Sequence, residues 1–218
     1  MRSILTFLLF IGLSSGTFSR VSNYYFVFLN TNPDREELPA EQIQDLQNRH
    51  LANIDSLYRI KKLIAAGPFE GGGGMFILVA PTLDSAKRIL QTDPAIVAKR
   101  FNLEVFEFNF HIGSTCAIKE PFEMTSFHFI RYFKGVVDLD QDKFENLYMH
   151  HLNLYKNMKD SIIVDGTFSK NDGFIQIINT QNSDDIKEVI RNDSLVNQNY
   201  YYSEVKKIWI GKGTFCDK

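Results

Sequence analysis

The chain has 218 residues, of which 44% are hydrophobic and 23% are charged, and its 24 basic and 26 acidic residues leave a formal net charge of −2. This composition is that of a globular protein and argues against disordered, collagen-like and low-complexity classes. Because there is no excess of basic residues, binding of nucleic acid through bulk charge is not expected.

The N-terminus has the pattern of a secretory signal peptide. Arg2 precedes an apolar run at 4–13, and small residues follow at 14–16. The run is 10 residues long, whereas a helix that spans a bilayer needs about 20. We therefore expect residues 1–19 to be a signal peptide and the mature protein to be secreted or periplasmic, without membrane association. A buried N-terminal strand or an uncleaved anchor is the alternative.

The following hundred or so residues predict a mixture of strands and helices. Aromatic and β-branched residues indicate strands, and apolar residues at helical spacing indicate helices. Gly67 and Pro68 end the element after the first helix, and a glycine-rich turn occupies 71–74. In the last strand, alternate phenylalanines share one face. The predicted elements are strand 24–29, helix 41–64, the element that ends at 67–68, the wholly apolar strand 75–80, helix 82–92 and strand 104–110. Their order is β-α-β-β-α-β, which is the ferredoxin-like unit.

The second half of the chain repeats the first at a spacing near 100 residues. Residues 49–51 correspond to 150–152 at an offset of 101, and 84–93 correspond to 184–193 at an offset of 100. For the apolar strand, 74–78 align with 173–177 at an offset of 99. Such a long period indicates duplication of a small domain. The second copy is predicted to consist of strand 127–133, helix 142–158, strands 161–165 and 174–179, helix 184–192 and strand 204–210.

The duplication predicts how the two units pack. Each unit has one face covered by helices and one open face, and the apolar strand 75–80 indicates that both faces are buried. We expect the two open faces to pack together as an intramolecular counterpart of a homodimer. Cys116 and Cys216, which follow the last strand of each unit, are candidates for a disulfide because such bonds persist outside the cytosol. Two free thiols are the alternative.

A histidine interrupts the apolar stripe of the first helix in both units. His50 lies four residues after Leu46 and four before Ile54, so it shares their face. His151 holds the same place in the second copy. Its predicted stripe consists of Phe144, Leu147, Leu154 and Met158.

An aspartate recurs in the same way near the end of the second helix. Asp93 follows Ile89 by four residues, and Asp193 is its counterpart. Because a buried, unpaired charge is costly, we predict that Asp93 pairs with His50 and Asp193 with His151. A carboxylate bound to one ring nitrogen leaves the other free to act as a base. The alternative is a structural pair that ties two helices together.

These motifs together resemble the YCII-related (YciI-like) domain over residues 21–112 and, more weakly, over 124–213. The resemblance rests on the His50-Leu51 helix motif, Gly67-Pro68, the apolar strand and Asp93-Pro94 before a Phe-rich strand. It implies an α+β fold that dimerises as an α/β barrel, distantly similar to muconolactone isomerase-like proteins. It also implies an active site formed by a His–Asp pair. The second copy departs from the pattern at Thr167 and Ser194, where the family has proline.

We therefore expect a signal peptide (1–19), a first YCII-like domain (20–112), a linker (113–124) and a second domain (125–218), packed as a pseudo-dimeric barrel. The predicted function is isomerase-, lyase- or hydrolase-type acid–base chemistry on a small molecule, without a metal or organic cofactor. A non-catalytic small-molecule binding module or a protein-interaction module is the alternative. The sequence leaves the substrate and further oligomerisation open.

Overall fold

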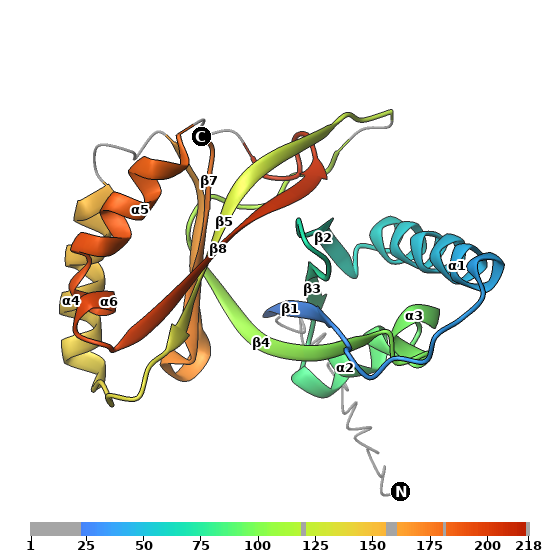
Figure 1. Cartoon of the computed structure of the whole chain (residues 1–218), viewed down its shortest axis with the longest axis horizontal. Coiled ribbons are helices and arrows are strands. Elements are labelled where there is room, and N and C mark those ends of the chain that lie inside the picture. The colour runs from blue at the N-terminus through green and yellow to red at the C-terminus, as the bar shows by residue number, and fades with distance from the viewer. Residues whose placement is uncertain (1–22, 119–120, 156–160, 181, 217–218) are drawn as a thin grey trace, which may run out of the picture.

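The computed structural model describes residues 23–118, 121–155, 161–180 and 182–216. These residues form one antiparallel sheet of eight strands in the order β2-β3-β1-β4-β6-β7-β5-β8. The helices lie outside the sheet, in two groups at opposite ends of the long axis (Figure 1). The predicted signal peptide lies outside the described residues.

Each half of the chain contributes one ferredoxin-like unit to this sheet. The first consists of β1 (Asn23–Thr31), α1 (Ala40–Arg59), β2 (Leu63–Pro68), β3 (Gly74–Ala80), α2 (Leu83–Leu90), the short α3 (Pro94–Val97) and β4 (Phe101–Ile112). The second consists of β5 (Met124–Lys134), α4 (Gln141–Leu154), β6 (Ile162–Phe168), the 3-10 turn η2 (Ser169–Asn171), β7 (Gly173–Ile178), α5 (Ser183–Asn192), α6 (Ser194–Asn197) and β8 (Tyr201–Gly211). The predicted α+β fold of two tandem units is confirmed. No helix within the described residues is long and apolar enough to cross a membrane.

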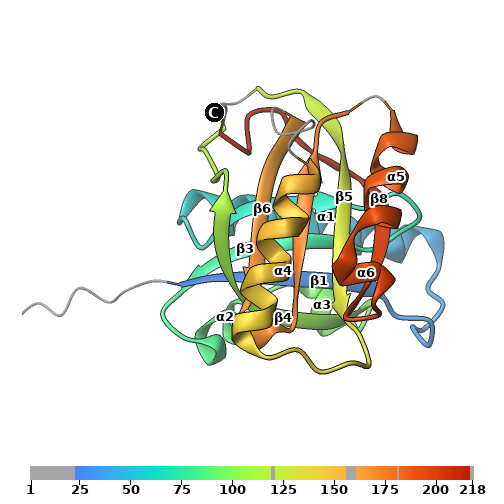
Figure 2. The same ribbon diagram turned by 90° about the vertical axis from the view of Figure 1, so that its left-hand side faces the viewer.

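The two units join along two seams. At one seam, β4 of the first unit pairs antiparallel with β6 of the second. At the other, Phe69 forms a bridge with Ile208 of β8, and the Glu70 amide donates a hydrogen bond of 2.9 Å to the Lys207 carbonyl. The sheet therefore closes into the predicted barrel, with α4, α5 and α6 covering the outside of the second unit (Figure 2).

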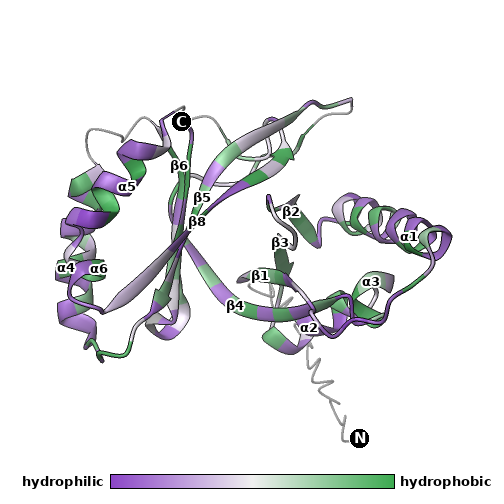
Figure 3. Cartoon of the chain, viewed as in Figure 1, coloured by the Kyte–Doolittle hydropathy of each residue, from purple (hydrophilic) through white to green (hydrophobic). Residues whose placement is uncertain are grey.

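The inside of the barrel is a core shared by both units. Phe26, Ile77 and Phe108 of the first unit pack in one cluster with Phe129 and Ile177 of the second. Two further clusters lie between the sheet and the helices of each unit. In Figure 3 the helices carry both hydrophobic and hydrophilic residues, as expected for helices with one buried face. The shared core is why the two units form one barrel.

The first helix ends earlier than its apolar pattern predicts. It stops at Arg59, and Lys61 has a φ of 57°, the left-handed conformation in which helices often end. Leu63 and Ile64, which the pattern assigned to the helix, belong to β2. When apolar residues continue from a helix into the next strand, their spacing alone does not indicate where the helix ends.

The buried stripe of α4 also differs from the prediction. Tyr148 and Tyr155 are buried, whereas Leu154 is 38% exposed. Met158 lies outside the described residues. Phe144 is buried as predicted, but tyrosine side chains hold further inward positions that the pattern did not assign to the stripe.

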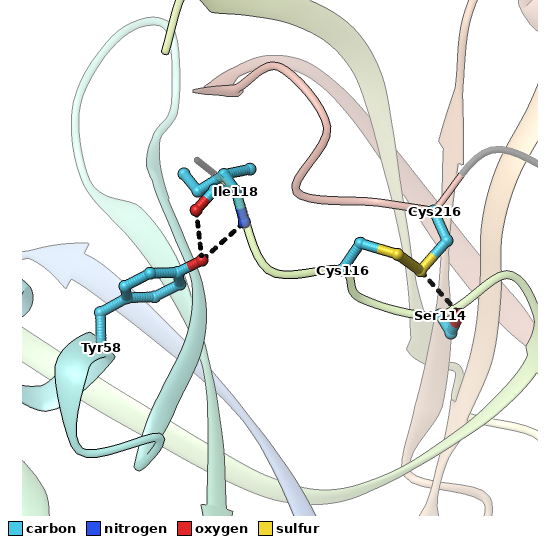
Figure 4. Close-up of a disulfide and its surroundings, with 5 residues drawn as sticks. All are labelled: Tyr58, Ser114, Cys116, Ile118 and Cys216. Carbon is cyan, nitrogen blue, oxygen red and sulfur yellow. Dashed lines mark hydrogen bonds between the residues drawn. A yellow bond between two sulfur atoms is a disulfide. The ribbon is translucent and has the colours of Figure 1, made fainter. Parts of the chain in front are cut away.

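A disulfide links the C-terminal ends of the two units. Cys116, just after β4, is bonded to Cys216, just after β8, with 5.1 Å between their Cα atoms. Nearby, the Tyr58 hydroxyl at the end of α1 accepts a hydrogen bond of 2.7 Å from the Ile118 amide (Figure 4). These contacts attach the segment after β4 both to α1 and to the end of the chain.

Candidate functional site

In the first unit, a histidine and an aspartate from separate elements form a buried pair. His50 Nδ1 of α1 lies 2.7 Å from Asp93 Oδ2. The other carboxylate oxygen, Oδ1, accepts a hydrogen bond of 2.9 Å from the Ala95 amide. Asp93 is only 1% exposed, so both oxygens are used and neither faces solvent. The predicted contact between His50 and Asp93 is present in the structure.

The local sequence positions this carboxylate at the start of a short helix. The second helix ends at Leu90, so Asp93 does not lie on its face as the i+4 spacing suggested. Asp93 is instead the N-cap of α3, with Pro94 at the first helical position. Asp at the N-cap and Pro at the next position are both favoured because they satisfy or remove unpaired amides. The cap fixes the carboxylate in the orientation that binds the imidazole.

A cavity of about 350 Å³ adjoins this pair. The His50 side chain lines the cavity and is 11% exposed. Because Nδ1 is bound to Asp93, Nε2 is the ring nitrogen left for another partner, and it makes no hydrogen bond to the described residues. The wall is mostly apolar. It consists of Leu29, Gln47, His50, Leu51, Ile54, Ala66, Gly67, Pro68, Gly73, Gly74, Met75, Phe76, Phe101 and Met124.

The glycine-rich turn between β2 and β3 forms one edge of the cavity. Gly73 and Gly74 belong to the wall. At Gly73 the φ is +74°, and an added Cβ would lie 2.5 Å from the Leu29 carbonyl oxygen. A side chain there would therefore strain the backbone and clash with β1. The turn allows β3 to begin close to β1 and leaves the space beside His50 free of side chains.

The second unit contains the same pair, but it is closed off from solvent. His151 Nδ1 lies 2.6 Å from Asp193 Oδ2, and Asp193 Oδ1 caps α6 through the Leu195 amide. The His151 side chain is 0% exposed, and its Nε2 is buried without a hydrogen-bond partner. The predicted contact is present here too, but its free nitrogen has no access to water or ligand.

Aromatic rings surround this second imidazole. The ring centroids of Phe174, Tyr155, Tyr132 and Tyr148 lie 4.9, 5.0, 5.1 and 5.7 Å from that of His151. Around His50 the nearest rings are farther away, those of Phe76 and Phe101, both at 6.1 Å. The second unit therefore has rings where the first has space.

Strand pairing fixes which residues of the two units correspond. Ile77 and Ile177 both lie in the barrel core, so β3 and β7 align at an offset of 100. The offset of 99 predicted from the sequence is wrong for this strand, and Gly74 corresponds to Phe174, not to Gly173. Seven residues of the cavity wall therefore have a larger or more polar counterpart in the second unit. These pairs are Leu29 and Tyr132, Gln47 and Tyr148, Ile54 and Tyr155, Ala66 and Asp165, Gly74 and Phe174, Phe76 and Gln176, and Phe101 and Tyr201.

The aromatic residues around His151 belong to a hydrogen-bond network that the sequence analysis did not predict. The Tyr148 hydroxyl donates to Asp165 Oδ1, and the Gln176 amide donates to Asp165 Oδ2 at 2.9 Å. Tyr132 and Tyr155 hydroxyls are 2.6 Å apart. Burial raises the pKa of Asp165, although the hydrogen bonds from Tyr148 and Gln176 oppose this. The available signal was the spacing of Tyr148 and Tyr155, three residues before and four after His151.

Of two sequence comparisons, one finds a match. Residues 24–109 match the model of the YCII-related domain. Comparison with curated proteins finds no match.

Several solved structures share the fold over most of the chain. A heme-binding protein from Thermus thermophilus is 12% identical, with a TM-score of 0.50, over 88% of this chain and 92% of that one. A candidate monooxygenase from Fusobacterium nucleatum is 9% identical, with a TM-score of 0.50, over 91% and 98%. A candidate chlorite dismutase is 10% identical, with a TM-score of 0.52, over 88% and 94%. At these identities the likeness shows the fold alone. Over residues 24–109, which are the first unit, the chain is similar to the YCII-related domain family.

Proposed function

We propose that the protein is a small-molecule enzyme that transfers protons in its first unit, with His50 as the acid–base and Asp93 as the residue that orients it. The observation that carries this proposal is the difference between the two units. The same His–Asp pair borders a cavity in the first unit and is fully buried in the second. A purely structural pair would need no cavity in either unit.

The hydrogen bond to Asp93 defines what His50 can do. When Nδ1–H donates to the carboxylate, the neutral ring has its lone pair on Nε2, on the side of the ring away from Asp93. Nε2 can then accept a proton from a substrate C–H, O–H or a water molecule, and the imidazolium that forms lies against the Asp93 carboxylate. Returning that proton to another substrate atom gives isomerisation, and giving it to a leaving group gives elimination or hydrolysis.

The cavity is suited to a small and mostly apolar substrate. Its volume of about 350 Å³ lies within the range of ligand pockets, which is roughly 300–1,000 Å³. Gln47 and His50 supply the polar side chains of the wall. An apolar surrounding strengthens the interaction between an imidazolium and Asp93, because little water is present to screen it.

For the second unit we propose a structural role. The sequence predicts His151 and Asp193 as a second catalytic pair, but Nε2 of His151 is enclosed by protein. A group that cannot reach a substrate cannot exchange a proton with it. The pair then serves to join α4 to the start of α6.

Exchange of substrate hydrogen with solvent deuterium tests the proposal without knowledge of the substrate. Small carbon acids are incubated in D₂O with the wild-type protein, His50→Gln or His151→Gln, and ¹H NMR follows the loss of signal. We expect wild type and His151→Gln to accelerate exchange of the same compounds and His50→Gln to be inactive. Equal exchange by His50→Gln would remove that residue from the mechanism. Binding of compounds without any exchange would favour the alternative, a non-catalytic binding module.

We also propose that the protein acts outside the cytosol. The Cys116–Cys216 disulfide supports this, because such bonds persist in oxidising compartments. Mass spectrometry of protein recovered from outside the cytosol of expressing cells tests it. We expect a mature N-terminus after residue 16 or 19, and a full-length cytosolic product would contradict it.

A further inference from the structure

The second unit shows which side chains fit the space that is empty in the first. At the positions of Gly74, Leu29 and Ile54 it has Phe174, Tyr132 and Tyr155. Their rings, with that of Tyr148, account for the four aromatic groups around His151. Because both units share one backbone fold, the space beside His50 has a shape that aromatic rings fill in its counterpart.

The central ring of this filling is Phe174. It stacks on Tyr132 with centroids 4.1 Å apart and planes at 12°, and it meets the His151 ring edge to face at 4.9 Å and 76°. The edge-to-face arrangement is a favoured geometry for aromatic rings. At Gly74 no equivalent ring can be supplied by the chain, because an added Cβ would lie 2.7 Å from the Gly67 carbonyl oxygen. The space therefore remains available to a ligand.

The chemistry of the wall limits what such a ligand can carry. Among the described residues that line the cavity there is no Asp, Glu, Lys or Arg. A charged group would lose its hydration without gaining a counter-charge, so a neutral ligand is favoured. In the second unit the Tyr148 hydroxyl donates to Asp165 and the Tyr132 hydroxyl donates to Gln176. The first unit has Ala66 and Phe76 at the positions of these two acceptors. His50 Nε2 is therefore the group that a ligand hydroxyl would reach.

We propose that the His50 cavity binds phenols, that is, neutral single-ring aromatic compounds whose hydroxyl group forms a hydrogen bond with Nε2 of His50. This inference rests on the proposed function, because it assigns a ligand class to the same site. The ring takes the place that Phe174 holds in the second unit, between β3 and the imidazole.

Binding to a matched set of probes tests the ligand class. Phenol, cyclohexanol and benzoate are titrated into the full chain, and ligand-detected NMR measures each Kd. Phenol and cyclohexanol carry the same hydroxyl on a flat and a puckered ring, and benzoate carries a charge. Since an aromatic contact adds roughly 0.5–1.5 kcal/mol beyond area burial, we expect phenol to bind about twofold to tenfold more tightly than cyclohexanol. Benzoate should bind more weakly than phenol.

Substitutions that copy the second unit locate the bound ring. Ile54→Tyr and Gln47→Tyr introduce the residues found at Tyr155 and Tyr148, and both should abolish phenol binding by filling the cavity. Asn48→Tyr is the matched control, because Asn48 is exposed on the same helix and does not line the cavity. It should bind phenol like wild type. Melting temperatures of all three variants show whether each is folded, and the exposed position of Gln47 allows the test to stand if Ile54→Tyr unfolds.

Each outcome is decisive for the ligand class. The proposal that the cavity binds phenols would be overturned if phenol did not bind, if cyclohexanol bound equally well, or if benzoate bound more tightly. It would also be overturned if folded Gln47→Tyr still bound phenol. Deuterium exchange separates this failure from that of the proposed function. If exchange still depends on His50, the ligand class alone is wrong, and if that dependence is also lost, both proposals fail.

Discussion

Phe174 occupies in β7 the position that Gly74 occupies in β3. Gly74 leaves a cavity beside His50, whereas the Phe174 ring packs against His151. The two halves of the chain thus keep the same His–Asp pair and the same backbone but differ in access to it. Duplication has preserved the geometry of the pair in both units, and access distinguishes a candidate active site from a structural one.

The two aspartates allow a matched test of this distinction. Asp93→Asn keeps an oxygen that can cap α3 but removes the negative charge beside the imidazole. We expect hydrogen exchange to slow by about a hundredfold to ten-thousandfold, because the imidazolium loses its counter-charge. Loss of a charge-assisted hydrogen bond should also lower the free energy of unfolding by about 1–3 kcal/mol.

Asp193→Asn is the control for that measurement. The same bond is lost in the second unit, so urea unfolding should show a similar decrease in stability. The exchange rate should stay at the wild-type value. Equal slowing by both substitutions would mean that the rate follows overall stability, or that both units are active.

Phe174→Ala is expected to be costly for stability. The side chain is 0% exposed and stacks on Tyr132, so its removal leaves a cavity in the second unit. Substitutions of this kind destabilise by about 3–5 kcal/mol. Because apolar cavities bind small aromatic molecules, benzene should raise the unfolding midpoint of the variant more than that of wild type. A loss below about 1 kcal/mol would contradict the tight packing of this site.

The disulfide should contribute strongly to stability. Cys116 and Cys216 are 100 residues apart, and closing a loop of this length stabilises by about 4–5 kcal/mol in the chain-entropy account, as an upper guide. We expect the Cys116→Ser/Cys216→Ser variant to unfold at lower urea concentration than wild type. Dithiothreitol should shift wild type towards the variant and leave the variant unchanged. An identical midpoint for oxidised wild type and variant would contradict this role.

Asp165 should give the second unit a distinctive pH dependence. Burial raises its pKa in the folded state, so the folded protein holds this proton at pH values where the unfolded chain has released it. The contribution of Asp165 to the free energy of unfolding is therefore fully present below the pKa of an ordinary Asp. It is lost as the pH rises through the raised pKa of the folded state. Asp165→Asn cannot ionise, so its free energy of unfolding relative to wild type should improve as the pH rises through this range. Urea unfolding across mildly acidic pH measures the difference, and a difference independent of pH would contradict the burial argument.

Sequence patterns predicted the fold and the pairing within each unit well. The Phe106–Phe110 alternation placed these rings towards the barrel interior, where they pack against the core. Recurrence of His50 and Asp93 near 100 residues later indicated both pairs, because each residue type is rare on an apolar helix face. The contact between His50 and Asp93 nevertheless forms for another reason than the helical spacing predicted, since Asp93 caps α3 and does not lie on α2.

Access to the pair could not be predicted from one element at a time. The second site is filled by side chains from β5, α4 and β7, which include Tyr132, Tyr148 and Phe174. At the end of α4, the apolar pattern assigned Leu154 to the buried face, but its neighbour Tyr155 is the residue that is buried. On the strand, aligning Gly74 with Gly173 instead of Phe174 hid the substitution that fills the space. A shift of one residue exchanges the two faces of a strand, so small alignment errors have this effect.

The most direct test of the central claim is the ¹⁵N chemical shift of the histidine side-chain nitrogens during a phenol titration. His50 and His151 are assigned by comparison with His50→Gln and His151→Gln. We expect the Nε2 resonance of His50 to move with phenol concentration and to saturate, while both nitrogens of His151 stay fixed. His50 borders a cavity, whereas the His151 side chain is fully buried. A shift of His151 with His50 unchanged would contradict the assignment of the first unit as the functional one.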